Sequence, residues 1–109
     1  MSQAADIRIE AFVAALLVER RDLDTAGVLL THALGEITRH KPDGDPDRAE
    51  AESVYGAYLA ARGHTAEAET CLRDSLRILE EALGAGVETT RRARRRLAAL
   101  GETRQLEPQ

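Results

Sequence analysis

A residue pattern that recurs after 42 positions constrains the fold of this chain more than any other feature of its sequence. Ala26 and Ala68 set the register, which aligns residues of similar size or charge on either side of them. The other aligned pairs are Ala15 with Ala57, Leu17 with Leu59, Arg20 with Arg62, Leu30 with Leu72, Leu34 with Leu76, and Ile37 with Leu79. A fixed period of roughly 20 to 50 residues is typical of stacked arrays, in which each unit covers the apolar face of its neighbour.

The composition of the repeated unit favours helices over strands. Hydrophobic residues make up 43% of the 109 positions, but most are Ala and Leu, with one Phe, two Tyr and no Trp. Such a composition suits helices that pack closely through small side chains, whereas sheets are built mainly from β-branched and aromatic residues. We therefore expect an all-α fold of antiparallel helical hairpins, and the length fits a single domain over residues 1–109.

Apolar spacing and capping residues predict that the chain begins with a helical hairpin. The first helix is expected over about residues 5–21, and the second follows a cap at Asp22 or Asp24. Residues 41–47 contain two prolines and a glycine, so the second helix must end near residue 40. The apolar face of the first helix is expected to consist of Ile9, Phe12, Val13, Leu16 and Leu17.

Three further helices follow from the same signals. The third is expected over about residues 47–62 with Asp47 as its cap, and the fourth runs to about residue 83 with Thr65 as its cap. The fifth, over about residues 89–100, has a thin apolar stripe and is expected to end before Gly101. The predicted organisation is a first repeat over about 5–46, a second over about 47–88, a partial capping repeat over 89–101 and a tail over 102–109.

The repeated positions resemble the tetratricopeptide repeat. In that family a large, a small and another bulky residue mark the first helix, and Ala followed by a bulky residue marks the second. The second unit here has Tyr55, Gly56 and Leu59, then Ala68 and Leu72. The first unit has Val13, Ala14 and Leu17, then Ala26 and Leu30, and the third keeps Leu97 and Ala98. The 42-residue period resembles the long variety of kinesin light chains and of many bacterial multi-repeat proteins.

This resemblance implies a short right-handed superhelix of five helices, whose first helices line a shallow concave face. It also implies a protein- or peptide-binding adaptor or scaffold. The binding-face candidates carried over by family position are Arg8, Ala11, Ala15, Glu50, Ser53, Ala57, Arg92, Arg95, Arg96 and Ala99. Arg92 and Arg96 match two basic positions with which some members hold a terminal carboxylate. The other clamp positions fall on Ala11, Ala15 and Val54, which cannot hydrogen-bond a carboxylate.

The basic residues are concentrated at the C-terminal end of the chain. Residues 1–87 carry 9 basic and 16 acidic side chains, whereas residues 88–109 carry 6 basic and 3 acidic ones. Five of the six basic residues are Arg91, Arg92, Arg94, Arg95 and Arg96. We favour a solvated capping helix whose arginines pair with Glu80, Glu81 or Glu88. The alternative is that these arginines hold an acidic peptide, because a guanidinium group can bind a carboxylate through two hydrogen bonds.

Other chemistries find little support in the sequence. Asp43, Asp45 and Asp47 alternate like the start of a calcium loop, but the sixth and twelfth places hold Arg48 and Val54 instead of Gly and Glu. The three histidines and Cys71 share no metal-ligand spacing, and no catalytic set or phosphate loop is visible. We expect neither an enzyme nor a bound cofactor or metal.

Two rivals to a peptide-binding adaptor remain open at this point. One is a structural module that associates with itself, since a short array keeps an exposed apolar end. The other is RNA binding through the arginine-rich helix. RNA is the less favoured partner, because the chain has a net charge of −4. The longest apolar run, residues 11–18, is too short to span a bilayer, so we expect a cytoplasmic protein without a membrane anchor.

Overall fold

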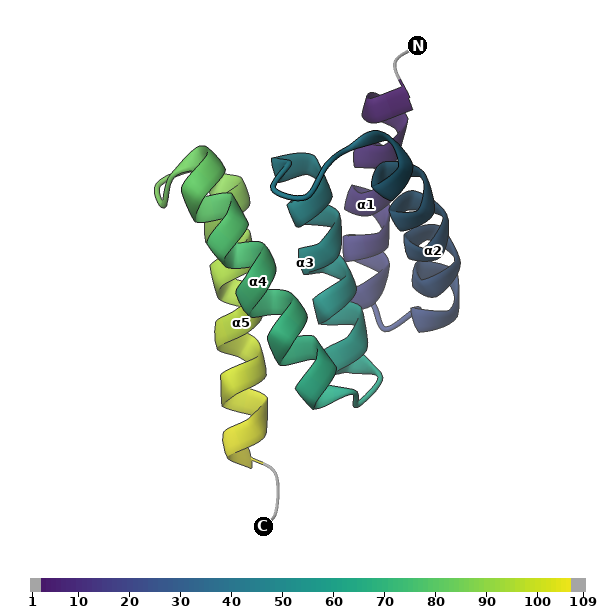
Figure 1. Cartoon of the computed structure of the whole chain (residues 1–109). Coiled ribbons are helices and arrows are strands. Elements are labelled where there is room, and N and C mark those ends of the chain that lie inside the picture. Colours follow the sequence, from purple (N-terminus) through teal and green to yellow (C-terminus); the bar gives the residue numbers. More distant parts are fainter. Residues whose placement is uncertain (1–2, 107–109) are drawn as a thin grey trace.

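The computed structural model describes the backbone of residues 3–106 and the side chains of residues 7–103. This part of the chain contains five helices and no strand (Figure 1). The helices are α1 (Gln3–Glu19), α2 (Leu23–His40), α3 (Pro46–Ala61), α4 (Thr65–Leu83) and α5 (Glu88–Leu106). The prediction of an all-α fold with five helices is confirmed for these residues.

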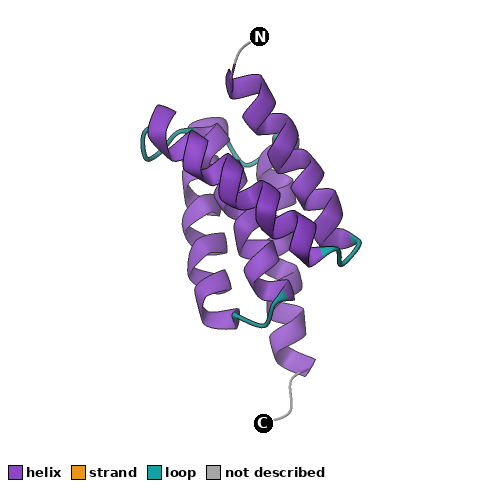
Figure 2. Ribbon diagram, turned by 90° about the vertical axis from the view of Figure 1, so that its right-hand side faces the viewer, coloured by secondary structure: helices purple, strands orange, loops and turns teal. Residues whose placement is uncertain are grey.

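The helices stack as hairpins. Helices α1 and α2 form one hairpin, α3 and α4 form the next, and α5 packs against α3 and α4. Helix α3 lies in the middle and also contacts α1 and α2, so the two hairpins share one continuous stack of 48 × 31 × 20 Å. The short loops lie at the ends of the helices (Figure 2). The predicted stacking of helical hairpins is confirmed.

Equivalent positions of the two repeats form the core. Ala26 and Ala68 are both 0% exposed, and so are Leu30 and Leu72 four residues later. Ile37 and Leu79 are likewise buried at the far ends of α2 and α4. Small side chains thus bring the helix backbones together, and larger ones fill the space between them. The 42-residue period therefore pairs residues that are buried at equivalent places in the two hairpins.

Helix α1 is rotated relative to the prediction. It buries Ile7, Ala11 and Ala14 rather than the predicted face, and the two alanines let it approach α2 and α3 closely. The large residues left exposed are Phe12 (62%), Ile9 (61%), Leu16 (43%) and Val13 (38%). The expected inward face is wrong for these four residues. Since α1 is apolar around most of its circumference, the spacing of its apolar residues could not select the buried side.

Two of the predicted helix caps are displaced. Helix α3 is capped by Asp45, not Asp47, and the Asp45 carboxylate accepts hydrogen bonds from the N–H groups of Asp47 (2.9 Å) and Arg48 (3.3 Å). Pro46 is the first helical residue, where its missing N–H costs nothing. Helix α4 already includes Thr65, and its preceding residue caps it without a side-chain hydrogen bond.

The other helix boundaries follow the prediction except at the C-terminal end. Asp22 caps α2 by accepting a hydrogen bond from Thr25 N–H at 3.4 Å. Helix α5 continues through Gly101 to Leu106 instead of ending at residue 100. A single glycine lowers helix stability by only about 1 kcal/mol and does not force an end. The expected tail is therefore helical to residue 106, and residues 107–109 lie outside the described residues.

The turn between α1 and α2 contains a strained residue that offers a test of the repeat. Arg21 has a φ of 66°, whereas the equivalent position of the next repeat is Gly63, with a φ of 86°. The left-handed region disfavours L-residues other than Gly. We expect Arg21→Gly to raise the free energy of unfolding by about 0.5–1 kcal/mol in urea denaturation. Arg20→Gly should give no gain, and equal gains for both variants would contradict the strain.

Candidate functional site

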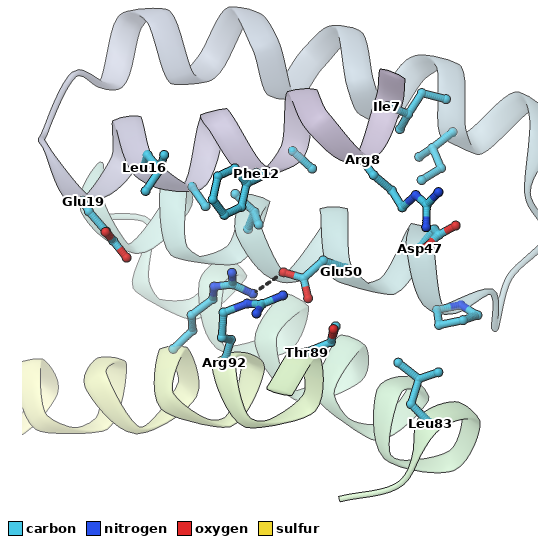
Figure 3. A pocket seen from close by; sticks show the side chains of 16 residues that line it. Ile7, Arg8, Phe12, Leu16, Glu19, Asp47, Glu50, Leu83, Thr89 and Arg92 are labelled. Carbon is cyan, nitrogen blue, oxygen red and sulfur yellow. Dashed lines mark hydrogen bonds and ion pairs between the residues drawn. The ribbon is translucent and has the colours of Figure 1, made fainter. Parts of the chain in front are cut away.

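A groove with a volume of about 370 Å³ runs between α1, α3 and α5. These are the first helices of the two repeats and of the partial third one. Figure 3 shows α1 along one wall and α5 along the other, with side chains of α3 between them. The groove is lined by Ile7, Arg8, Ala11, Phe12, Ala15, Leu16, Glu19, Ile37, Pro46, Asp47, Glu50, Val54, Leu83, Thr89, Arg92 and Arg96.

Six of the ten binding-face candidates line this groove. They are Arg8, Ala11, Ala15, Glu50, Arg92 and Arg96. The other four lie elsewhere. Ser53 is completely buried and Ala57 is half-buried, while Arg95 and Ala99 are exposed outside the groove.

Sequence reasoning missed the apolar wall of the groove. The sequence predicts Phe12 and Leu16 in the core, but they lie with Ala15 on the side of α1 that faces the groove. The spacing of four residues between Phe12 and Leu16 places them one turn apart on the same side of the helix. Their size was visible in the sequence, but their exposure depends on which face of α1 packs, and this the sequence did not decide.

One ion pair crosses from α5 to α3 inside the groove. Arg96 Nη1 donates hydrogen bonds to Glu50 Oε1 at 2.8 Å and to Ser53 Oγ at 2.9 Å. Both charged side chains are largely buried, with 15% and 20% exposure. The second carboxylate oxygen of Glu50 is buried without a hydrogen-bond partner among the described residues. Arg96 is therefore engaged in holding the two helices together.

Three further arginines of α5 are paired with carboxylates of their own chain. Arg94 contacts Glu80 at 3.1 Å, and Arg95 and Arg91 contact Glu88 at 2.6 and 3.9 Å. The hydrogen bond from Arg95 lowers the pKa of Glu88. The predicted pairing of these arginines with Glu80 and Glu88 is present, whereas Glu81 pairs with Arg77 of its own helix.

Arg92 differs from Arg91, Arg94, Arg95 and Arg96. It is half-buried and lines the groove, and no ion pair or hydrogen bond joins its side chain to any other described side chain. Its guanidinium group lies beside the Arg96–Glu50 pair (Figure 3). The pKa of Glu88 is lowered chiefly by the hydrogen bond from Arg95 and also by the charge of Arg92, which makes no direct contact with it. The hydrogen-bond donors of Arg92 therefore stay available to a group that enters the groove from outside. Arg8 lines the opposite wall and likewise forms no ion pair or hydrogen bond with another described side chain.

Cys71 and His32, two side chains that could take part in other chemistry, are each hydrogen-bonded within the chain. Cys71 donates a hydrogen bond from its thiol to the Glu52 carbonyl at 3.0 Å, and burial raises the pKa of the thiol to about 11. It is therefore protonated at neutral pH and a poor nucleophile. His32 contacts Glu10 at 2.7 Å, and that hydrogen bond raises the pKa of His32.

The aspartates of the inter-repeat turn serve separate local roles. Asp43 contacts Arg48 at 2.9 Å, Asp45 caps α3, and Asp47 lies 3.9 Å from Lys41. Across the part of the chain that the structure describes, no group of three or more His, Cys, Asp or Glu residues is arranged to hold a metal ion. None of the helices within residues 3–106 combines the length and apolar character needed to cross a membrane.

Comparison of the chain with protein-family models, with curated proteins and with solved structures gives no match. Membership of the tetratricopeptide family therefore stays a prediction from the sequence. The function proposed below therefore rests on the groove and on the charged side chains that line it.

Proposed function

We propose that this chain is a binding module for another protein, and that its groove accepts a short segment in which an acidic residue lies next to a large apolar one. The single observation that supports this most is the state of Arg92. Among the arginines of α5 whose side chains the structure describes, it alone lines the groove without a direct contact to a carboxylate. A half-buried guanidinium group binds a carboxylate more strongly than an exposed one, because less water competes for it.

The opposite wall supplies the apolar part of the site. Phe12 and Leu16 are 62% and 43% exposed, and both line the groove. An aromatic and a branched side chain left in water gain free energy when a partner covers them. The volume of about 370 Å³ is near the lower end of known ligand pockets, so it fits a few side chains of a peptide.

The resemblance to tetratricopeptide repeats supports the same proposal, since in that family the first helices line the binding face. The family membership, the adaptor role and the cytoplasmic location remain part of the proposal. A catalytic role is not proposed, because no His or Cys is among the residues that line the groove. RNA binding is disfavoured, because Arg94, Arg95 and Arg96 already contact carboxylates of the chain.

The test is selection from a displayed library of short random peptides on the immobilised protein. We expect the selected peptides to be enriched in Asp or Glu next to Phe, Leu, Ile or Trp. In fluorescence anisotropy, Arg92→Glu should weaken the binding of such a peptide by about tenfold or more, because it replaces an attraction by a repulsion.

Arg91→Glu is the matched control for this experiment. Arg91 lies one residue away on α5, but it is exposed outside the groove and contacts Glu88. Its substitution changes the net charge by the same amount and should leave peptide binding nearly unchanged. Equal losses in both variants would reveal general attraction between opposite charges and would contradict the groove as the binding site. Selection of peptides without acidic residues would contradict it as well.

A further inference from the structure

The two ends of the helix stack differ in chemistry. At one end, the exposed residues of α5 between 88 and 103 are charged, polar or small, among them Glu88, Arg91, Arg95 and Glu102. At the other end, α1 exposes Ile9, Val13 and Leu16, which we call the α1 end face. These three residues follow one another at spacings of four and three and so form one stripe along the helix. One end of the stack is therefore capped, and the other is not.

No helix of the described part covers the α1 end face. Helix α1 contacts α2 and α3 only, and α5 lies at the opposite end of the stack (Figure 1). Terminal units of helical arrays normally carry a polar outer face, which keeps them soluble and stops further stacking. Helix α5 meets this requirement, whereas the exposure of Ile9 (61%), Leu16 (43%) and Val13 (38%) shows that α1 does not.

We propose that a second copy of this chain covers the α1 end face, so that two molecules pair through antiparallel α1 helices about a two-fold axis. A head-to-tail arrangement would press the apolar stripe of one copy against the charged α5 of the next, and these charges would lose water without gaining partners. A two-fold arrangement instead places apolar against apolar, and it closes after two copies.

The charges beside the stripe favour the antiparallel orientation. Arg8 and Glu19 lie eleven residues apart, which is about three helical turns, so both fall on the same edge of α1. Both are exposed, and neither forms an ion pair with another described side chain. In an antiparallel pair that shares this edge, Arg8 of each copy comes opposite Glu19 of the other. A parallel pair would place like charges together.

The size of the stripe predicts a weak dimer. A stable interface buries about 800 Å² on each partner, and three partly exposed side chains supply only a fraction of this area. We therefore expect monomers at low concentration and dimers at high concentration. Ile9 and Val13 lie outside the groove, whereas Leu16, Arg8 and Glu19 line it, so the dimer would share one edge of α1 with the proposed peptide site.

Sedimentation velocity over a range of protein concentrations tests the dimer. The wild type should shift from monomer to dimer, and Val13→Glu should abolish the shift, because each copy would bury a charge in the shared face. Val28→Glu is the matched control, since Val28 is 71% exposed on α2 and lies outside the stripe. A wild type that stays monomeric at all concentrations, or an equal effect of both substitutions, would overturn the proposal.

A charge exchange tests the orientation. Arg8→Glu and Glu19→Arg should each weaken dimerisation by several-fold, and the double variant should restore it, because the opposite charges again face each other. Failure of the double variant to recover would overturn the antiparallel arrangement. Arg92→Glu should leave dimerisation unchanged, so loss of peptide binding and loss of the dimer can be told apart.

Discussion

Replacing Leu72 with alanine is expected to lower the free energy of unfolding by about 3 kcal/mol. Leu72 is completely buried on α4, where it packs with Leu59, Ala68 and Leu100 from α3, α4 and α5. Its loss removes a large buried apolar surface and leaves a cavity that the surrounding helices fill only in part. Urea denaturation of the variant measures the change. Val28→Ala, at a position that is 71% exposed, should change stability little.

Gly56 on α3 provides a sharper form of this test. A Cβ atom at Gly56 would lie 2.7 Å from Leu72 Cγ, which is closer than van der Waals contact allows. Gly56→Ala should therefore destabilise the protein, although Gly to Ala within a helix usually adds about 1 kcal/mol. In the Leu72→Ala background the clash with Leu72 Cγ is gone and the methyl group occupies the cavity, so the same substitution should stabilise. An effect of the same sign in both backgrounds would contradict this packing.

The repeat explains why so much of the fold could be predicted from the sequence. Ala26 and Ala68 occupy equivalent crowded positions, where a larger side chain would separate the helices, so their recurrence reports directly on packing. Breakers such as Pro42 and Gly63 act through local backbone geometry, and this also is legible in the sequence. Neither the recurring alanines nor the helix breakers depend much on contacts between helices that are far apart in the sequence.

The parts that could not be predicted depend on contacts between distant helices. Ala11 and Phe12 are adjacent in α1, yet one is 5% and the other 62% exposed, because α1 packs through its small residues. The arginines of α5 pose the same problem. The sequence indicates that glutamates should neutralise them, but only the fold shows that Arg96 reaches Glu50, a residue 46 positions earlier. The fold also decides that the side chain of Arg92, four residues before Arg96, makes no direct contact with a described carboxylate.

The pair of Arg96 and Glu50 leads to the second large effect. Arg96→Ala is expected to lower the free energy of unfolding by about 2–3 kcal/mol, because it leaves a buried carboxylate and the fully buried Ser53 hydroxyl without their donor. Replacing both members by methionine should cost much less, since no charge is then left unpaired. A double-mutant cycle in urea denaturation measures the coupling between them.

The control for this cycle is the ion pair of Arg95 and Glu88, which has a shorter N–O distance but is exposed to solvent. Its atoms lie 2.6 Å apart, against 2.8 Å for Arg96 and Glu50, while its side chains are 63% and 54% exposed. Water and salt screen an exposed pair, so Arg95→Ala should change stability far less than Arg96→Ala does. Equal losses would mean that distance rather than burial sets the strength of these pairs, and that α5 is not held to α3 by the ion pair in the groove.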